Sequence, residues 1–85
     1  MDCLGMHISV DDIVIHDKMF GRVCACVSEL GTFLVIVEAL HKVADVSKHF
    51  MRCQCTGQLR VWRALELEQG YVWMFHPDGI VDVVC

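Results

Sequence analysis

RVCACVSELGTFLVIVE, residues 22–38, is the stretch that decides the fold of this chain. It holds two runs rich in β-branched residues on either side of Glu-Leu-Gly, and a three-residue turn ending in a left-handed glycine is a common hairpin connection. Pairing the runs across that turn places Val23 opposite Val37, an apolar pair. It also places Arg22 opposite Glu38, and opposite charges that face each other stabilise a strand pair. The stretch therefore predicts an antiparallel β-hairpin.

The strongest turn sequence of the chain is Pro77-Asp78-Gly79. With the same turn rule, Phe75 faces Val81 across the hairpin. Two residues further from the turn, Trp73 faces Val83. This part of the sequence predicts a second antiparallel hairpin at the end of the chain.

Two further turns follow the same rule. Met19-Phe20-Gly21 connects a hairpin in which Ile13 faces Val27, and Cys55-Thr56-Gly57 connects one in which Phe50 faces Trp62. Together the turns predict strands at 12–18, 22–28, 32–40, 49–54, 58–63, 71–76 and 80–84, with a polar connection at 41–48 and either a helical turn or extended chain at 64–69. The predicted fold class is all-β: a small antiparallel barrel or compact sandwich of about seven short strands.

Composition limits the class of protein. The chain has 85 residues, is 55% hydrophobic and 21% charged, and carries a formal charge of −4. This length predicts a single domain, 1–85, and the hydrophobicity excludes disorder. No apolar run approaches the ~20 residues of a membrane-spanning helix, and Asp2, Asp11 and Asp12 interrupt any candidate export signal. The prediction is a cytoplasmic protein with no membrane contact, and its negative charge disfavours nucleic acid.

The first half of the chain resembles a known class of small barrels. Asp11-Asp12-Ile13-Val14, then Gly21-Arg22-Val23, then Phe33 to Glu38 is similar to the opening of SH3-like and KOW-type barrels, over about residues 10–40. The resemblance implies an SH3-like barrel. Two departures are the lack of a basic surface and the two strands that follow residue 69.

A second resemblance involves the later part of the chain. Val61-Trp62-Arg63-Ala64-Leu65, followed by Trp73 and Asp78-Gly79, is similar to hypothetical proteins encoded by mobile integron gene cassettes. That resemblance implies no active site.

The hairpin registers sort the side chains into two faces, and both are apolar. The first collects Ile13, Ile15, Val23, Ala25, Val27, Phe33, Val35 and Val37, and the second collects Val14, His16, Cys24, Cys26, Leu34 and Ile36. An antiparallel sheet with one solvated face alternates apolar and polar residues, and this one does not. Either the last hairpins wrap over the second face, or another chain covers it, or it lines a pocket for a small apolar ligand. We predict a homo-oligomer, with a dimer favoured, that associates through Val14, Leu34 and Ile36.

The hairpin at 49–63 predicts a second surface. Phe50 and Trp62 would face each other there, with Arg52 and Arg60 beside them. Tryptophan and arginine are enriched in protein hot spots, and aromatic rings among arginines also stack nucleic-acid bases. The third alternative is a packed ring pair with arginine stems lying across it. We predict that these four residues bind a protein partner.

The cysteines raise the question of a metal. Cys24-Ala-Cys26 and Cys53-Gln-Cys55 have one-residue gaps, whereas zinc sites use gaps of two to four residues. On a strand, such a gap places the two Cα atoms ~7 Å apart on one face. We predict no metal, with His16, Cys24 and Cys26 as the ligands if one binds, and we expect the thiols to be reduced and buried.

Nothing in the sequence assembles a catalytic centre. A Cys24 nucleophile beside His16 lacks the accessible setting that promotes a thiolate. We therefore predict no catalytic residue and no cofactor. The predicted function is a non-catalytic, self-associating protein-interaction module. The alternatives are a nucleic-acid-binding small barrel that uses the aromatic–arginine hairpin, and a small-molecule or enzymatic pocket at a subunit interface.

Overall fold

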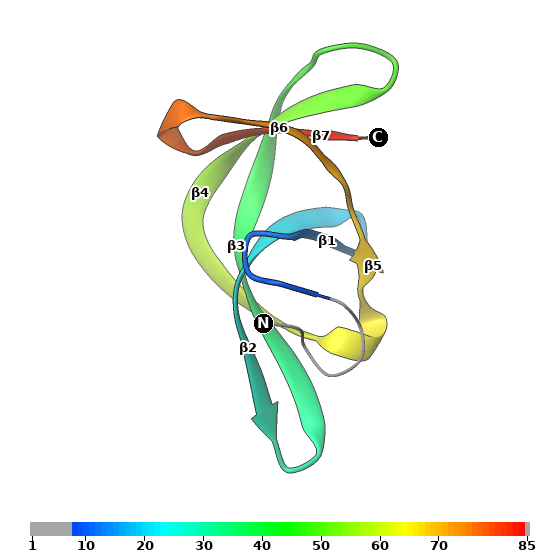
Figure 1. The fold of residues 1–85 in the computed structure, drawn as a ribbon, viewed down its shortest axis with the longest axis vertical. Helices are drawn as coiled ribbons and strands as arrows, with labels where there is room; N and C mark the ends of the chain where they lie inside the picture. Colours follow the sequence, from blue (N-terminus) through cyan, green and yellow to red (C-terminus); the bar gives the residue numbers. More distant parts are fainter. Residues whose placement is uncertain (1–7, 85) are drawn as a thin grey trace.

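The computed structural model describes residues 8–84, and they form one antiparallel sheet of seven strands (Figure 1). The strands are β1 (Ile13–His16), β2 (Met19–Glu29), β3 (Thr32–Asp45), β4 (Phe50–Arg63), β5 (Glu68–Gln69), β6 (Val72–His76) and β7 (Ile80–Val84). Their order in the sheet is β5-β1-β2-β3-β4-β7-β6. The prediction of an all-β fold with seven strands is confirmed. Within residues 8–84, no helix is long and apolar enough to cross a membrane.

Two of the predicted three-residue turns are two-residue turns. Asp17 and Lys18 have φ of 49° and 66°, and Leu30 and Gly31 have φ of 49° and 78°. Positive φ at both central residues defines the type I′ turn, whose twist matches that of the flanking strands. Gly21 is therefore a strand residue. A Cβ there would lie 2.9 Å from Trp62 Cζ3, so glycine permits a close approach of the ring to the backbone.

Because the first turn comprises Asp17 and Lys18, the side chains of β1 lie on the faces opposite to those predicted. Ile13 pairs with Arg22 and not with Val27, which is a shift by an odd number of residues. An odd shift moves every side chain of a strand to the opposite face. Val14 therefore packs with Val23 in one core, whereas Ile13 lies in the other. The predicted composition of the two faces was wrong for this strand.

A β-bulge corrects the register of β2 on β3. Next to the turn, Val27 pairs with Leu34, one residue away from the predicted partner. The register shifts at Cys24, between Val23 and Ala25, because an extra residue is accommodated there. Beyond the bulge, Val23 pairs with Val37, as predicted. Arg22 likewise pairs with Glu38, so the predicted register is confirmed for the half of the hairpin that lies away from the turn.

β4 is one continuous strand, and the hairpin predicted at 49–63 was wrong. Gly57 has a φ of 76° but forms an irregularity of the strand and not a turn. The Thr56 hydroxyl donates a hydrogen bond to the Ala39 carbonyl at 2.8 Å, which holds the irregularity against β3. Phe50 consequently pairs with Val84 of β7. The predicted polar connection at 41–48 is largely strand, because β3 extends to Asp45.

The C-terminal half resolves one open question and confirms one hairpin. Ala64–Glu66 forms a 3-10 turn, and the chain then extends into β5. Across the turn at Pro77–Gly79, Phe75 pairs with Val81, as predicted. A bulge between Val72 and Met74 places Val72, in place of Trp73, opposite Val83. Continued by two more residues, the predicted register places Tyr71 opposite Cys85, which lies outside the described residues.

Two hydrophobic cores lie on opposite sides of β1. The first comprises Ile8, Val14, Val23, Val35, Val37, Trp62 and Ala64. The second comprises Ile13, Met51, Cys53, Val81 and Val83, with Phe20, Leu40 and Val72 packed against it. The β6–β7 hairpin therefore covers the second face of the sheet at the β1 end. Figure 1 shows the tip of the β2–β3 hairpin at the opposite end of the molecule, away from β6 and β7.

Candidate functional site

The part of the second face that β6 and β7 leave open is an apolar surface. Residues directly opposite each other in an antiparallel sheet share a face. Ile36 pairs with Ala25 on one side and Val61 on the other. Leu34 pairs with Val27 in the next row. We define the outer apolar face as Val27, Leu34, Ile36, Leu59 and Val61.

The outer apolar face lies in the centre of the sheet and is open to solvent. Val61 is 59% exposed and Leu59 is 62% exposed, while Val27 is 39% exposed. Leu34 and Ile36 are half-buried between them on β3. Apolar side chains that are contiguous on three neighbouring strands differ from isolated surface residues, which need no explanation, and they mark interaction sites.

Two of the three predicted self-association residues belong to this face. Leu34 and Ile36 do, but Val14 is fully buried in the first core and was wrongly placed. Sequence reasoning missed Leu59 and Val61 because a false hairpin turn separated them from their neighbours on β3. Their alternation along the strand was the available signal.

Charged residues border the outer apolar face. Glu29 lies on β2 and Arg63 on β4, and both are exposed. Arg63 Nη1 lies 4.0 Å from Glu66 Oε1, the long limit of an ion pair. Arg22 donates to Asp11 Oδ1 at 2.7 Å, and this hydrogen bond raises the pKa of Arg22. An apolar centre with a polar rim is the usual anatomy of a protein interface.

On β4, β7 and β6, a second cluster of side chains lies on the face opposite the second core. We define the aromatic face as Phe50, Arg52, Trp73, His76 and Asp82. The Phe50 and Trp73 rings stack with centroids 4.3 Å apart and an angle of 23° between their planes. Trp73 remains 49% exposed.

A buried carboxylate organises the polar part of the aromatic face. Asp82 is fully buried and accepts hydrogen bonds from Arg52 at 2.9 Å and 3.2 Å. Its other partner is His76 Nε2, at 2.7 Å from Oδ2. The Arg52 guanidinium, assisted by His76, lowers the pKa of Asp82 to about 2 despite the opposing effect of burial. Asp82 therefore stays ionised and holds the Arg52 guanidinium and the His76 ring in place.

The structure separates the four residues predicted to bind a partner. Phe50 and Arg52 belong to the aromatic face, but Trp62 is 8% exposed and lies in the first core. Its ring stacks on His16 with centroids 5.1 Å apart. Arg60 is exposed and pairs with Val37, far along β4 from Phe50. The predicted Phe50–Trp62 pair was wrong because β4 does not fold back on itself.

The separation of these four residues also argues against the alternative of nucleic-acid binding at the aromatic face. The predicted stacking platform required both rings and both arginines on one hairpin. On the aromatic face, Arg52 is neutralised by Asp82, and the Phe50 and Trp73 rings stack on each other. The arrangement favours neither base stacking nor phosphate binding there.

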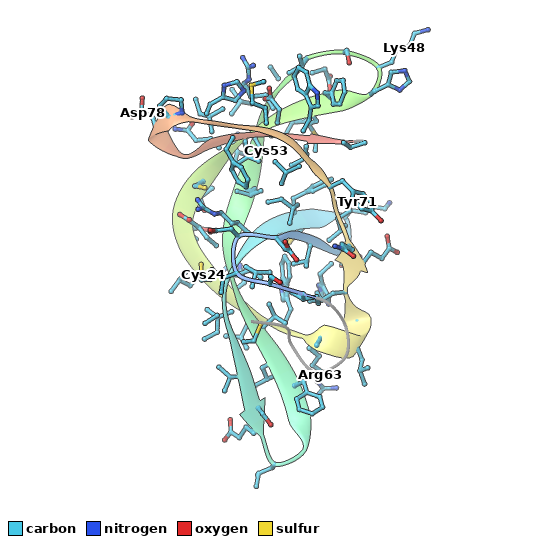
Figure 2. The ribbon with its side chains drawn as sticks, viewed as in Figure 1. Cys24, Lys48, Cys53, Arg63, Tyr71 and Asp78 are labelled. Atoms are coloured by element: carbon cyan, nitrogen blue, oxygen red, sulfur yellow. The ribbon has the colours of Figure 1, made fainter. Side chains whose placement is uncertain are left out.

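The predicted metal ligands are not assembled. His16 pairs with Met19, and its ring lies 3.2 Å from Glu66 Oε2 rather than beside Cys24. Among residues 8–84, no group of three or more His, Cys, Asp or Glu side chains could hold a metal ion. Figure 2 shows that Cys24 and Cys53 lie at different levels along the sheet.

The cysteines differ in state. Cys24, Cys53 and Cys55 carry thiols, and Cys53 is buried as expected, whereas Cys24 is exposed. Cys26 is disulfide-bonded, which corrects the expectation of a reduced thiol at that position. Burial raises the pKa of the Cys55 thiol, although a hydrogen bond from Arg22 opposes the change. A raised pKa keeps Cys55 protonated, unlike an activated nucleophile.

Comparison with known proteins identifies no relative: no protein-family model, curated protein or solved structure matches the chain. The outer apolar face and the aromatic face are therefore the features from which we infer a function.

Proposed function

We propose that this protein is a non-catalytic, self-associating protein-interaction module. The observation that carries the proposal is the outer apolar face, which lies in the middle of the sheet and is covered by none of the described elements. Burial of exposed apolar surface is the dominant favourable term in protein association, at about 25 cal/mol per Å².

A second copy of the chain fits this face. In a two-fold contact the same patch lies on both sides, so an apolar centre meets an apolar centre. A two-fold axis parallel to β3 brings β2 of one copy onto β4 of the other. Glu29 of one copy then approaches Arg63 of its partner. Opposite charges at the two borders thus support a symmetric dimer over random apolar contact.

The test uses Val61→Asp, which places a charge in the centre of the outer apolar face. Val61 is 59% exposed, so the isolated fold tolerates the change, whereas an unpaired charge in an interface is costly. Light scattering after size-exclusion chromatography measures the mass, with a single chain at 9.7 kDa. Val43→Asp is the matched control, because Val43 is 54% exposed on the distal end of β3.

We expect Val61→Asp to reduce the assembly and Val43→Asp to leave it intact. A wild-type mass of one chain at micromolar concentration contradicts the proposal, as does an unchanged mass in Val61→Asp. A charge swap tests the symmetry. Arg63→Glu should weaken association, and adding Glu29→Arg in the same chain should restore it.

We propose that the aromatic face binds the protein partner, in place of the predicted surface that included Arg60 and Trp62. Phe50 and Arg52 remain from the sequence prediction, and Trp73 and His76 join them. The test is whether Trp73→Ala weakens binding of an isolated protein partner while Trp62→Phe, a change in the core, does not.

The remaining assignments stay predictions. The order β5-β1-β2-β3-β4 in a curled meander supports the resemblance to SH3-like and KOW-type barrels. The resemblance to integron cassette proteins gains no support. A cytoplasmic location also stays a prediction.

A further inference from the structure

β6 is an edge strand without the charged side chains that usually protect one. It is the last strand in the order of the sheet. Trp73 is 49% exposed, Met74 is 45% and Phe75 is 50%. Natural edge strands are guarded by charges, proline, β-bulges or very short length, because their unpaired backbone groups attract other strands, and of these β6 has the bulge between Val72 and Met74. Val72–His76 contains no lysine, arginine, acidic residue or proline over its five residues.

The bulge in β6 makes the two faces of this strand symmetric. Val72 pairs with Val83 and Phe75 pairs with Val81, so both side chains lie on the side of the second core. Met74 pairs with Asp82 on the opposite side. Trp73 also lies on that side, since it stacks on Phe50, which shares its face with Arg52 and Asp82. The two outer residues of 72–75 therefore lie on the side of the second core, and the two inner residues lie on the opposite side. This order of sides is the same in either direction along the strand.

We propose that β6 pairs antiparallel with β6 of a second copy. In the register that matches the faces, Val72 lies opposite Phe75 of the second copy, and Trp73 lies opposite Met74. Each pair then joins two apolar side chains on one face, which is the arrangement that stabilises neighbouring strands. A regular strand matches its faces in registers that place one residue opposite its own counterpart, whereas the bulge shifts the match to this register.

Neighbouring residues hold the rings of β6 before any contact forms. Trp73 stacks on Phe50 at 4.3 Å, and the Arg22 guanidinium lies 5.6 Å from the centroid of the Phe75 ring. Side chains that are already ordered lose less conformational entropy on association. The strand carries no formal charge with histidine neutral, so it adds no local like-charge repulsion to that of the net charge of −4.

This contact is separate from the outer apolar face, although it rests on the proposed function in that both join copies of this chain. One chain with two different two-fold contacts forms assemblies larger than a dimer. Removing either contact leaves a dimer, and removing both leaves a monomer. The mass of each variant therefore reports the two contacts independently.

The experiment compares four proteins by light scattering at one concentration: the wild type, Met74→Lys, Val61→Asp and the double variant. Lysine on an edge strand blocks strand pairing, and Met74 is 45% exposed, so the fold of the single chain tolerates the new charge. Met19→Lys is the matched control, because Met19 is 44% exposed on β2. Circular dichroism checks the fold, and Phe75→Lys replaces Met74→Lys if the latter does not fold.

We expect more than two chains for the wild type and the control, two chains for each single variant, and one chain for the double variant. A Met74→Lys mass equal to that of the wild type overturns the β6 contact. So does a wild-type dimer that Val61→Asp converts to monomer, although that result supports the outer apolar face. If Val61→Asp keeps the wild-type mass while Met74→Lys yields monomer, the β6 contact stands and the outer apolar face fails.

Discussion

Replacing Trp62 with alanine tests whether this ring belongs to the core or to a partner surface. The residue is 8% exposed, and its ring stacks on His16 with centroids 5.1 Å apart. Truncating a buried tryptophan costs about 3–5 kcal/mol, because the transfer free energy is lost and a cavity remains. A chain of 85 residues has only about 4–13 kcal/mol of stability at roughly 0.05–0.15 kcal/mol per residue. We therefore expect Trp62→Ala to lose roughly a quarter or more of the stability of the chain.

Urea denaturation followed by far-ultraviolet circular dichroism measures the loss, with all variants at the same chain concentration because association adds stability. Trp73→Ala is the matched control. Trp73 is 49% exposed and stacks on Phe50, so we expect a loss of about 0.5–1.5 kcal/mol from the lost ring pair. A loss for Trp62→Ala no larger than that of the control would refute the placement of Trp62 in the core.

Three other predictions follow from local geometry. Arg52 lowers the pKa of Asp82 to about 2 from 3.8. Because the folded pKa lies below the unfolded one, this stabilisation is present above about pH 4 and lost as the pH falls toward about 2. Thermal melts of Asp82→Asn should lack that part of the acid dependence, and an unchanged acid profile contradicts the assignment. Gly21→Ala should lower stability by about 1–3 kcal/mol in urea melts, since its Cβ would lie 2.9 Å from Trp62 and Val37; a neutral effect contradicts the close packing. Lys18→Gly should raise the melting temperature, because Lys18 has a φ of 66°, and a left-handed conformation costs non-glycine residues roughly 1–2 kcal/mol.

Local chemistry explains which parts of the fold sequence reasoning predicted correctly. Pro77-Asp78-Gly79 combines a fixed φ with two residues that tolerate positive φ, so the pairing of Phe75 with Val81 followed from a few neighbouring residues. The strand content followed from β-branched residues in the same way. Leu34 and Ile36 were placed on an apolar second face because alternation along one strand is a local property.

The predicted strand register was wrong where several possible connections satisfy the same local rules. Gly57 has the positive φ of a turn residue, yet β4 continues through it because both halves of the strand pair with the long β3. Gly21 suggests a turn, but a strand glycine lets Trp62 pack against the backbone. Neither choice is visible in the neighbouring residues, because each depends on a partner distant in the sequence. For this reason Trp62 and Val14, which we predicted to lie on interaction surfaces, lie in the core.

The sequence by itself determined that this protein is an antiparallel β structure, that it ends in a tight hairpin, and that it has more apolar faces than one core can bury. The tertiary structure alone decided the rest. It decided which apolar residues remain open, that Asp82 is buried between Arg52 and His76, and that a bulge gives β6 a symmetric edge. The physical reason is that strand propensity and turn chemistry act between near neighbours, whereas register, bulges and burial minimise the free energy of the whole sheet together.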